Sequence, residues 1–444
     1  MFETLPGFRE FYPDDCAVRS YIFRHWRQTA QAFGFSEYDP PLLEPLELIT
    51  AKSGEEIVTQ LFNFEDKGGR QVTLRPELTP SMARMVGARA NSLKRPIRWF
   101  AIAENFRYEK PQKGRLRSHY QLNCDLLGEP GPAADAEIIA LAIQALQAFG
   151  LGPENFIIRL SDRNLWIAYL AALGLEDTAC TQVLGVIDKL ERLSPEVAIE
   201  QLKPQFSAGA AEDFLARVNE LKSIRDLDTL EKFFSAYVQG EAVTERLAQW
   251  RELVSLLDAL GVGEYIRIDL GIVRGLAYYT GFVFEAFQTV GKGRALCGGG
   301  RYDHLVEKLG GPAVPAVGFG MGDVTLRDLL EERKLLPPLI EAADVFVVAM
   351  GDSAREAALR DVMLLRAAGY RTVYALKPSG FSKQLKQADQ NGARLALIYG
   401  EEELQQGAVK IRHLAARAEQ VFPRRQLIEA VAHVLEDGLP ETSS

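Results

Sequence analysis

The stretch FRYEKPQKGRLR, residues 106–117, decides how the rest of this chain is interpreted. It places five cationic side chains among twelve residues around a Pro/Gly turn, and apolar residues flank it within 97–102 and 122–127. This pattern predicts a strand, a basic loop and a second strand. Arginines fixed at strand ends bind phosphates through two hydrogen bonds, whereas lysines act as point charges. The stretch indicates a nucleoside triphosphate, a nucleic-acid end, or both, although a basic loop taken alone is more often only a solvated surface.

The spacing within this stretch adds a second indication. Arg107 and Glu109 are two positions apart, so on a strand both side chains face the same side. A guanidinium and a carboxylate directed into one pocket can hold a phosphate together with an amine or a ribose.

Composition limits the class of protein. With 444 residues the chain is too long for one core, so two or three domains are expected. The formal net charge of −9 argues against a non-specific nucleic-acid coat protein but allows a local basic patch. No apolar run is long enough to span a bilayer, so no membrane contact is expected. The four cysteines match no metal or disulfide spacing and the first residues do not resemble a signal peptide, so we expect a cytoplasmic protein with no metal site of its own.

Changes in amino-acid composition and in hydrophobic pattern along the chain predict its domain organisation. Residues 162–260 are rich in Leu, Ala, Glu and Arg and are typical of a helical insertion, because strand patterns precede and follow them. We therefore expect one domain built from residues 1–161 and 261–334, interrupted by that insertion. Residues 335–444 alternate strand and helix patterns, which predicts a small doubly wound α/β domain. It lacks a dinucleotide glycine fingerprint, which favours a protein- or RNA-contact module.

Five segments in order carry a resemblance to a known family. Residues 106–109 with the following basic loop resemble the second signature motif of class II aminoacyl-tRNA synthetases, and in detail that of histidyl-tRNA synthetases. The other signatures follow the family's order: 34–41 (first motif, with Pro41 as its signature proline), 74–80 (substrate-amine segment), 274–281 (histidine-specific signature) and 298–303 (its companion). The resemblance covers nearly the whole chain. It implies an α/β multidomain protein with an antiparallel sheet core flanked by helices, the helical insertion, and a C-terminal anticodon-binding-like domain.

The resemblance also implies which residues bind L-histidine. Their shared task is to hold the α-amino group and to read the imidazole nitrogens. The amine would be held by Glu77, Thr79 and Gln121; the imidazole would be read by Asp125 and Tyr279; and the pocket would be lined by Tyr278 and Tyr302.

A second implied set binds ATP and carries the chemistry. Arg107 would sit at the α-phosphate and the histidine carboxylate, Glu109 would contact the adenine side, His119 would stack on the ring, and Arg115 would contact the outer phosphates. Arg274 resembles the family's catalytic arginine near the α-phosphate. Fixed guanidinium groups stabilise the charge that builds up when pyrophosphate leaves, so Arg107 and Arg274 are the expected catalytic residues. ATP is then a substrate, and we expect Mg²⁺ to be bound with it.

The implied macromolecular partners are tRNA-His and a second copy of this chain. The acceptor end of the tRNA would lie near Lys110, Gln112, Lys113 and Arg117. The C-terminal domain would bind the anticodon, with Lys377, Lys383 and Lys386 as phosphate contacts chosen from charge alone; a solvated helix face explains these lysines equally well. The first motif implies a homodimer.

Two positions depart from the family's pattern. Asp125 stands where many members have Glu, one methylene longer. Thr325 stands where most class II synthetases have the arginine that holds the γ-phosphate, and a branch including plant organellar forms is similar in this respect. We expect Arg115, helped by Mg²⁺, to hold the γ-phosphate instead. Arg327 is a weaker candidate, because on a helix it points elsewhere.

Three functions are therefore considered. The first is ATP-dependent activation of L-histidine and its transfer to the 3′ end of tRNA-His. The second is a non-catalytic histidine-sensing subunit resembling the regulator of ATP phosphoribosyltransferase, which the missing arginine favours. The third is a paralogue that aminoacylates something other than tRNA. The complete basic hairpin and the C-terminal domain favour the first.

Overall fold

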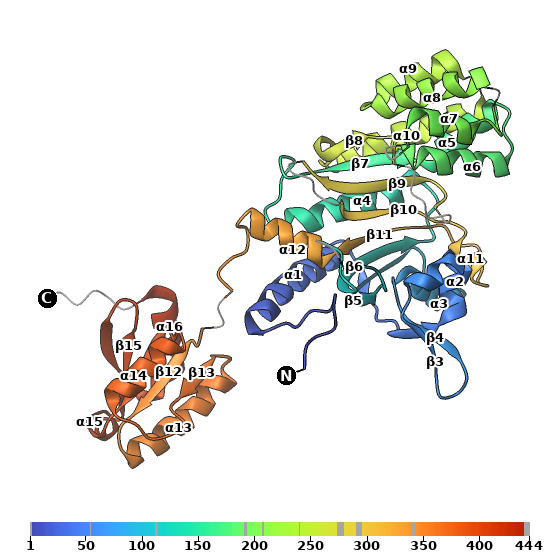
Figure 1. Cartoon of the computed structure of the whole chain (residues 1–444). Coiled ribbons are helices and arrows are strands. Elements are labelled where there is room, and N and C mark those ends of the chain that lie inside the picture. Colours follow the sequence, from blue (N-terminus) through green and yellow to red (C-terminus); the bar gives the residue numbers. More distant parts are fainter. Residues whose placement is uncertain are drawn as a thin grey trace. The chain divides into compact units, whose positions relative to one another are not determined.

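The computed structural model describes residues 2–53, 55–111, 114–190, 193–206, 208–238, 240–272, 279–289, 295–339 and 342–438. The chain divides into two compact units, Met1–Pro337 and Pro338–Ser444, which are described separately (Figure 1). No helix in the described part of the chain is both long and apolar enough to cross a membrane.

An eight-stranded sheet forms the centre of the first unit. In spatial order its strands are β1 (Ser36–Glu37), β5 (Ile97–Phe106), β6 (Ser118–Leu127), β11 (Ala316–Gly322), β10 (Ala295–Arg301), β9 (Phe282–Gln288), β7 (Phe156–Asp162) and β8 (Ile266–Ile268). The pairs β1–β5 and β7–β8 at the two edges are parallel, and the inner pairs are antiparallel. The sheet is therefore dominated by antiparallel pairing, as the resemblance implies. The predicted strand, basic loop and strand are confirmed as β5 and β6.

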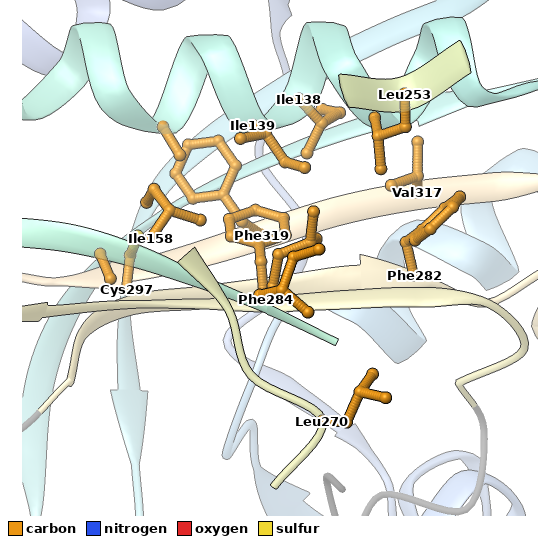
Figure 2. Packing of buried hydrophobic residues seen from close by; sticks show 14 of the residues in the cluster. Ile138, Ile139, Ile158, Leu253, Leu270, Phe282, Phe284, Cys297, Val317 and Phe319 are labelled. Carbon is orange, nitrogen blue, oxygen red and sulfur yellow. The ribbon is translucent and has the colours of Figure 1, made fainter. Parts of the chain in front are cut away.

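One face of this sheet packs against an almost wholly buried helix. Helix α4 (Pro132–Gln147) is apolar over most of its surface, which suits its position: β6, β10 and β11 lie beneath it while α1 (Pro13–Ala32) and α10 (Glu241–Ala259) flank it. Figure 2 shows Ile138 and Ile139 of α4 facing Val317 and Phe319 of β11, with Leu253 of α10 beside them. This core holds the strands that position the site.

The opposite face carries a smaller cluster and a small sheet. Strands β2 (Leu43–Pro45), β4 (Gln71–Leu74) and β3 (Asn63–Glu65) form a three-stranded antiparallel sheet. Around it lie α2 (Leu46–Ser53), η1 (Glu55–Gln60), α3 (Thr79–Arg89) and α11 (Leu305–Lys308). The second hydrophobic cluster includes Leu78, Met82, Tyr279 and Tyr302. Alternation along β5 directs Phe100 to the first core and Ala101 to this cluster, so the sheet separates two environments.

The segment between β7 and β8 is helical, as the sequence predicts. It contains α5 (Arg163–Ala172), α6 (Asp177–Ile187), α7 (Pro195–Leu202), α8 (Ala208–Ser223), α9 (Leu227–Tyr237) and α10, followed by η3 (Gly263–Tyr265). Because β7 and β8 are parallel neighbours, the chain leaves the sheet edge and returns to it. Its apolar residues join the same core cluster as α4, so the boundaries of a separate insertion domain remain a prediction.

The second unit is a five-stranded sheet covered by helices. Its strands lie in the order β13 (Thr372–Tyr374), β12 (Val345–Ala349), β14 (Leu395–Tyr399), β15 (Ala408–His413) and β16 (Ala418–Pro423). The first three are parallel, as expected from the alternation of strand and helix, and the last two are antiparallel. The helices are α13 (Asp352–Ala367), α14 (Phe381–Gln390), α15 (Glu401–Gln405) and α16 (Leu427–Asp437), with η4 (Arg424–Gln426). Separate apolar clusters cover the two faces.

Candidate active site

Strand β6 places a row of polar side chains on one face of the large sheet. His119, Gln121, Asn123 and Asp125 occupy alternate positions of the strand, so they share a face. The intervening Leu122, Cys124 and Leu126 belong to the hydrophobic core on the other face. The period of two therefore builds a polar floor for a site on top of a firmly packed strand.

A pocket of about 90 Å³ lies over the far end of this row; we term it the inner pocket. Its lining includes every residue predicted to bind histidine that the structure describes. These are Glu77, Thr79, Gln121, Asp125, Tyr279 and Tyr302. The remaining predicted residue, Tyr278, lies outside the described residues.

Asp125 is the most distinctive group of the inner pocket. It is 1% exposed, and Tyr302 donates a hydrogen bond to its Oδ1. Its Oδ2 has no hydrogen-bond partner among the residues that the structure describes. Burial raises the pKa of Asp125 to about 7, although the Tyr302 hydrogen bond and nearby Lys52 act in the opposite direction. A buried carboxyl group with one unsatisfied oxygen is suited to accept an N–H donor or a cation from a ligand.

Glu77 is paired with Lys52, a residue that is not among those expected from the sequence. Lys52 of α2 forms an ion pair with Glu77, and its own side chain is fully buried. A second unanticipated residue is Asn123, which lines the inner pocket, is 4% exposed and has an Oδ1 without a partner in the described part of the chain. Asn123 lies between Gln121 and Asp125 at alternate strand positions, so the sequence alone could have predicted that it shares their face of β6. Nothing in the local sequence distinguishes Lys52.

Two glycines of β11 make room for these side chains. Gly318 pairs with Asp125 and Gly320 pairs with Gln121 across the β11–β6 ladder. A Cβ at Gly318 would lie 2.2 Å from Asp125 Oδ1, and one at Gly320 would lie 1.7 Å from Gln121 Nε2. Larger residues would therefore displace the groups that line the inner pocket.

A second hollow of about 120 Å³, the outer pocket, opens beside the basic loop. It is lined by Arg107, Gly114, Arg115, Leu116, His119, Gly322, Val324 and Thr325. Arg107 borders both pockets, and its Nε donates to the Pro76 carbonyl at 3.2 Å. A guanidinium at the junction can contact groups in either pocket.

The charge around His119 is strongly positive. Burial and the neighbouring Arg107 lower the pKa of His119 to about 3, and Arg9 and Arg115 act in the same direction. The imidazole is therefore neutral near pH 7, which suits stacking on a neutral ring. Glu109 does not line the outer pocket but holds Arg115 Nε at 2.8 Å.

The basic-loop residues predicted to meet tRNA are only partly described. Gln112 and Lys113, like the predicted catalytic Arg274, lie outside the described residues. Lys110 is exposed, and Arg117 donates from Nε to the Glu109 carbonyl at 3.2 Å while its guanidinium lies 4.5 Å from the centre of the Tyr108 ring. The convergence of Arg107 and Arg274 on one centre therefore stays a prediction.

The structure describes both Thr325, which stands at the position of the expected γ-phosphate arginine, and Arg327, the weaker candidate for its role. Thr325 lines the outer pocket, as the alignment of motifs predicts. Arg327 instead forms ion pairs with Asp15 at 2.8 Å and with Glu331 at 2.7 Å on the outside of α12 (Asp323–Glu332). Arg327 is thus engaged elsewhere, as its helical spacing indicated.

Comparison with known proteins places both parts of the chain. A family model described as histidyl-tRNA synthetase matches residues 7–325, and one described as anticodon binding domain matches residues 344–433. A histidine–tRNA ligase of Opitutus terrae is 55% identical, and the match covers 96% of this chain and 97% of the relative. The chloroplastic/mitochondrial histidine–tRNA ligase of Arabidopsis thaliana is 37% identical, covering 92% and 82%.

Solved structures agree in fold. The histidyl-tRNA synthetase of Nostoc sp. PCC 7120 superposes with a TM-score of 0.80 at 24% identity, covering 98% of this chain and 99% of that one. A Bacillus halodurans structure described as an ATP phosphoribosyltransferase regulatory subunit/histidyl-tRNA synthetase has a TM-score of 0.72 at 25% identity, covering 87% and 96%. Because a family model spans most of the sequence and a 55% identical relative matches along nearly all of it, the chain belongs to the histidyl-tRNA synthetase family.

Proposed function

We propose that this chain activates L-histidine with ATP to histidyl-adenylate and transfers the histidyl group to the 3′ end of tRNA-His. The observation that carries the proposal is the pairing of two adjoining pockets. One ends in a buried carboxylate with an unsatisfied oxygen, Asp125, and the other is lined by cations. Arg107 borders both, which is where a carboxylate and a phosphate would have to meet.

The inner pocket suits histidine on chemical grounds. The unsatisfied Oδ2 of Asp125 can accept an imidazole N–H, and Tyr302 fixes the orientation of that carboxylate. Glu77, kept in place by Lys52, offers a negative charge to the α-amino group, with Thr79 and Gln121 beside it. Such a site rejects amino acids that leave the buried carboxylate without a partner.

The reaction needs positive charge rather than a protein nucleophile. The histidine carboxylate attacks the α-phosphorus, the bond to the β-phosphate oxygen breaks, and pyrophosphate leaves with its electron pair. Arg107, together with Arg274, would stabilise the charge on the α-phosphate oxygens. The neutral His119 would stack on adenine, with Glu109 on the adenine side, and Arg115 would contact the outer phosphates. Mg²⁺ would enter as part of the ATP complex.

The second unit supports the transfer step. Lys377 and Lys383 border an open hollow of about 580 Å³ that also includes Tyr374, and Lys386 is exposed on the same helix, α14. Anticodon bases are presented on a single-stranded loop, and proteins bind such bases by stacking and phosphate contacts. We expect Lys110, Gln112, Lys113 and Arg117 to approach the acceptor end. A homodimer built through the first motif and action in the cytoplasm complete the proposal.

The histidine-sensing regulator is the second candidate, because Thr325 removes one expected cation from the outer pocket. Two features weigh against it. The outer pocket keeps Arg107 and Arg115, and the chain carries an anticodon binding domain at residues 344–433. A pure histidine sensor has no need of either.

Histidine-dependent exchange of pyrophosphate into ATP separates these candidates. The purified chain should exchange only when histidine is present, and it should then charge tRNA-His. Arg107→Ala should slow the exchange by about 100-fold or more, as the loss of a fixed donor to a transition-state oxyanion does. Histidine binding without any exchange would instead identify a sensor.

A further inference from the structure

The outer pocket lacks a cation on the side formed by α12. Thr325 lines that side, Arg327 is engaged by Asp15 and Glu331, and Arg115 is held by Glu109 with about half of its side chain exposed. A triphosphate that extends along α12 needs a further positive group. Among the described residues near α12, Arg9 offers a guanidinium from another part of the chain.

The N-terminal segment reaches this region and is fixed there. The Gly7 carbonyl accepts hydrogen bonds from the backbone of Arg117 at 2.9 Å and of Ser118 at 3.3 Å, directly beside the basic loop. Gly7 has a φ of +86°, and a Cβ there would lie 2.9 Å from Arg117 Cγ, so only glycine permits this approach. The Phe8 ring lies 6.3 Å from that of Phe106. The segment is thus fixed against the basic loop and β5, next to residues that line the outer pocket.

Arg9 follows two residues after Gly7 and contacts the start of α12. Its Nη2 lies 2.8 Å from Oδ2 of Asp323, a carboxylate that also accepts the backbone N–H of Tyr120 at 2.9 Å. Gly322, Val324 and Thr325, on both sides of Asp323 in the sequence, all line the outer pocket. The ion pair therefore places a guanidinium against the element where the arginine is missing.

Arg9 has hydrogen-bonding capacity left over. Its side chain is 19% exposed, and its Nε is buried without an acceptor among the described residues. The guanidinium lies 4.8 Å from the centre of the Phe11 ring, which restricts its orientation. Arg9 also contributes, with Arg107 and Arg115, to the low pKa of His119. Because His119 lines the outer pocket, the charge of Arg9 acts on a group inside that pocket.

We propose that Arg9 supplies to the outer phosphates of ATP the guanidinium that this chain lacks at position 325. The inference rests on the proposed function, since it concerns how the same site holds ATP. Asp323 orients Arg9 from behind, and a planar guanidinium held in this way loses little freedom when a phosphate binds. Two guanidinium groups from different segments, Arg9 and Arg115, then flank the triphosphate.

Pyrophosphate exchange with the full-length protein tests the proposal. Arg9→Ala should raise the KM for ATP at least ~10-fold, because it removes a hydrogen bond to a charged group, and leave the KM for histidine unchanged. Arg9→Lys keeps a charge but not the planar geometry, and it should raise the KM for ATP several-fold. It provides the same readout should the alanine variant fail to fold.

Arg327→Ala is the matched control. It also removes an arginine that joins α12 to the N-terminal part of the chain, through Asp15, but Arg327 is not among the residues that line the outer pocket. Arg327→Ala should therefore retain a KM for ATP close to that of the parent chain. Asp323→Asn removes the ion pair that orients Arg9 and should raise the KM for ATP, but by less than Arg9→Ala does.

A second change should restore function if the two positions serve the same phosphates. Adding Thr325→Arg to Arg9→Ala should bring the KM for ATP back toward the parent value, and failure of this rescue would overturn the equivalence. An unchanged KM for ATP in Arg9→Ala, or an equal defect in Arg327→Ala, would overturn the role of Arg9. A parent chain without any histidine-dependent exchange would overturn the proposed function instead.

Discussion

At the scale of single residues, the candidate site contains ionisable groups whose burial costs stability. Asp125 is buried with one oxygen unsatisfied, Glu77 is held by the fully buried Lys52, and His119 is kept neutral by burial and by surrounding guanidinium groups. Burying such groups costs stability unless a partner satisfies them. If the proposed function is correct, histidine and ATP would supply further partners, and the unliganded chain would be less stable than the liganded one.

The ionisation of buried Asp125 should make the free energy of unfolding depend on pH. Its pKa of about 7 lies above the value of 3.8 for an unburied carboxyl, so between these limits the folded chain holds a proton that the unfolded chain has lost. The stability contributed by that proton is fully present below about pH 4 and is lost progressively as pH rises from there to about 7. Asp125→Asn cannot ionise and should be more stable than the parent chain at pH 8, by on the order of a few kcal/mol, and this difference should be clearly smaller at pH 5.

Thermal unfolding of both chains at the two pH values, without histidine, measures this difference. The variant should also show a higher KM for histidine, because the charge facing the imidazole is gone. A stability difference of the same size at pH 5 and pH 8 would contradict the assignment of the pH dependence to Asp125.

At the scale of elements, a residue at the end of strand β7 connects the large sheet to two helices. Asp162, the last residue of β7, has no exposed surface. Its Oδ1 caps α5 by accepting the Asn164 N–H at 2.9 Å, while its Oδ2 pairs with Arg246 and accepts from the Trp250 indole N–H. One carboxylate thereby joins the large sheet to the first and last helices of the insertion.

Asp162→Ala should therefore be far more damaging than loss of an ordinary helix cap. It removes the cap and leaves Arg246 and the Trp250 N–H unpaired in the interior, which should cost about 3–5 kcal/mol of unfolding free energy. Asp226 is the matched comparison, since it caps α9 through the Thr229 N–H at 2.8 Å from an exposed position. Asp226→Ala should cost about 1 kcal/mol. Urea unfolding of the three chains measures both values, and equal losses would refute the joining role of Asp162.

At the scale of the whole molecule, the two units divide the work. The first contains both pockets, and the second carries the exposed lysines around its own hollow. Amino-acid activation should therefore depend on the first unit alone, whereas tRNA binding should depend on charges in both.

Charge reversal in the second unit tests this division. Lys377→Glu with Lys383→Glu should raise the KM for tRNA at least several-fold and make it less sensitive to salt, because phosphate contacts are lost. Pyrophosphate exchange, which needs no tRNA, should be unchanged. Lys386→Glu, on the same helix but away from the hollow, should have a smaller effect. If all three changes leave the KM for tRNA unaltered across a salt series, the hollow is not part of the tRNA contact.

Local pattern was enough to predict a large part of this protein. Apolar runs on both sides of the basic Pro/Gly turn predicted β5 and β6, the change in composition predicted the helical insertion, and alternating strand and helix patterns predicted the second unit, because these signals arise between residues close in sequence. The resemblance also predicted that Glu77, Thr79, Gln121, Asp125, Tyr279 and Tyr302 serve one site, and the structure brings these six residues to the lining of one pocket.

Only the tertiary structure decided which distant residues complete the site. Lys52 reaches Glu77 from helix α2, and Arg9 meets Asp323 across more than 300 positions of sequence. The need for glycine at positions 318 and 320 likewise becomes visible only when β11 lies beside β6. These contacts depend on how the sheet and helices pack, and a side chain carries no local sign of the partner that folding brings to it.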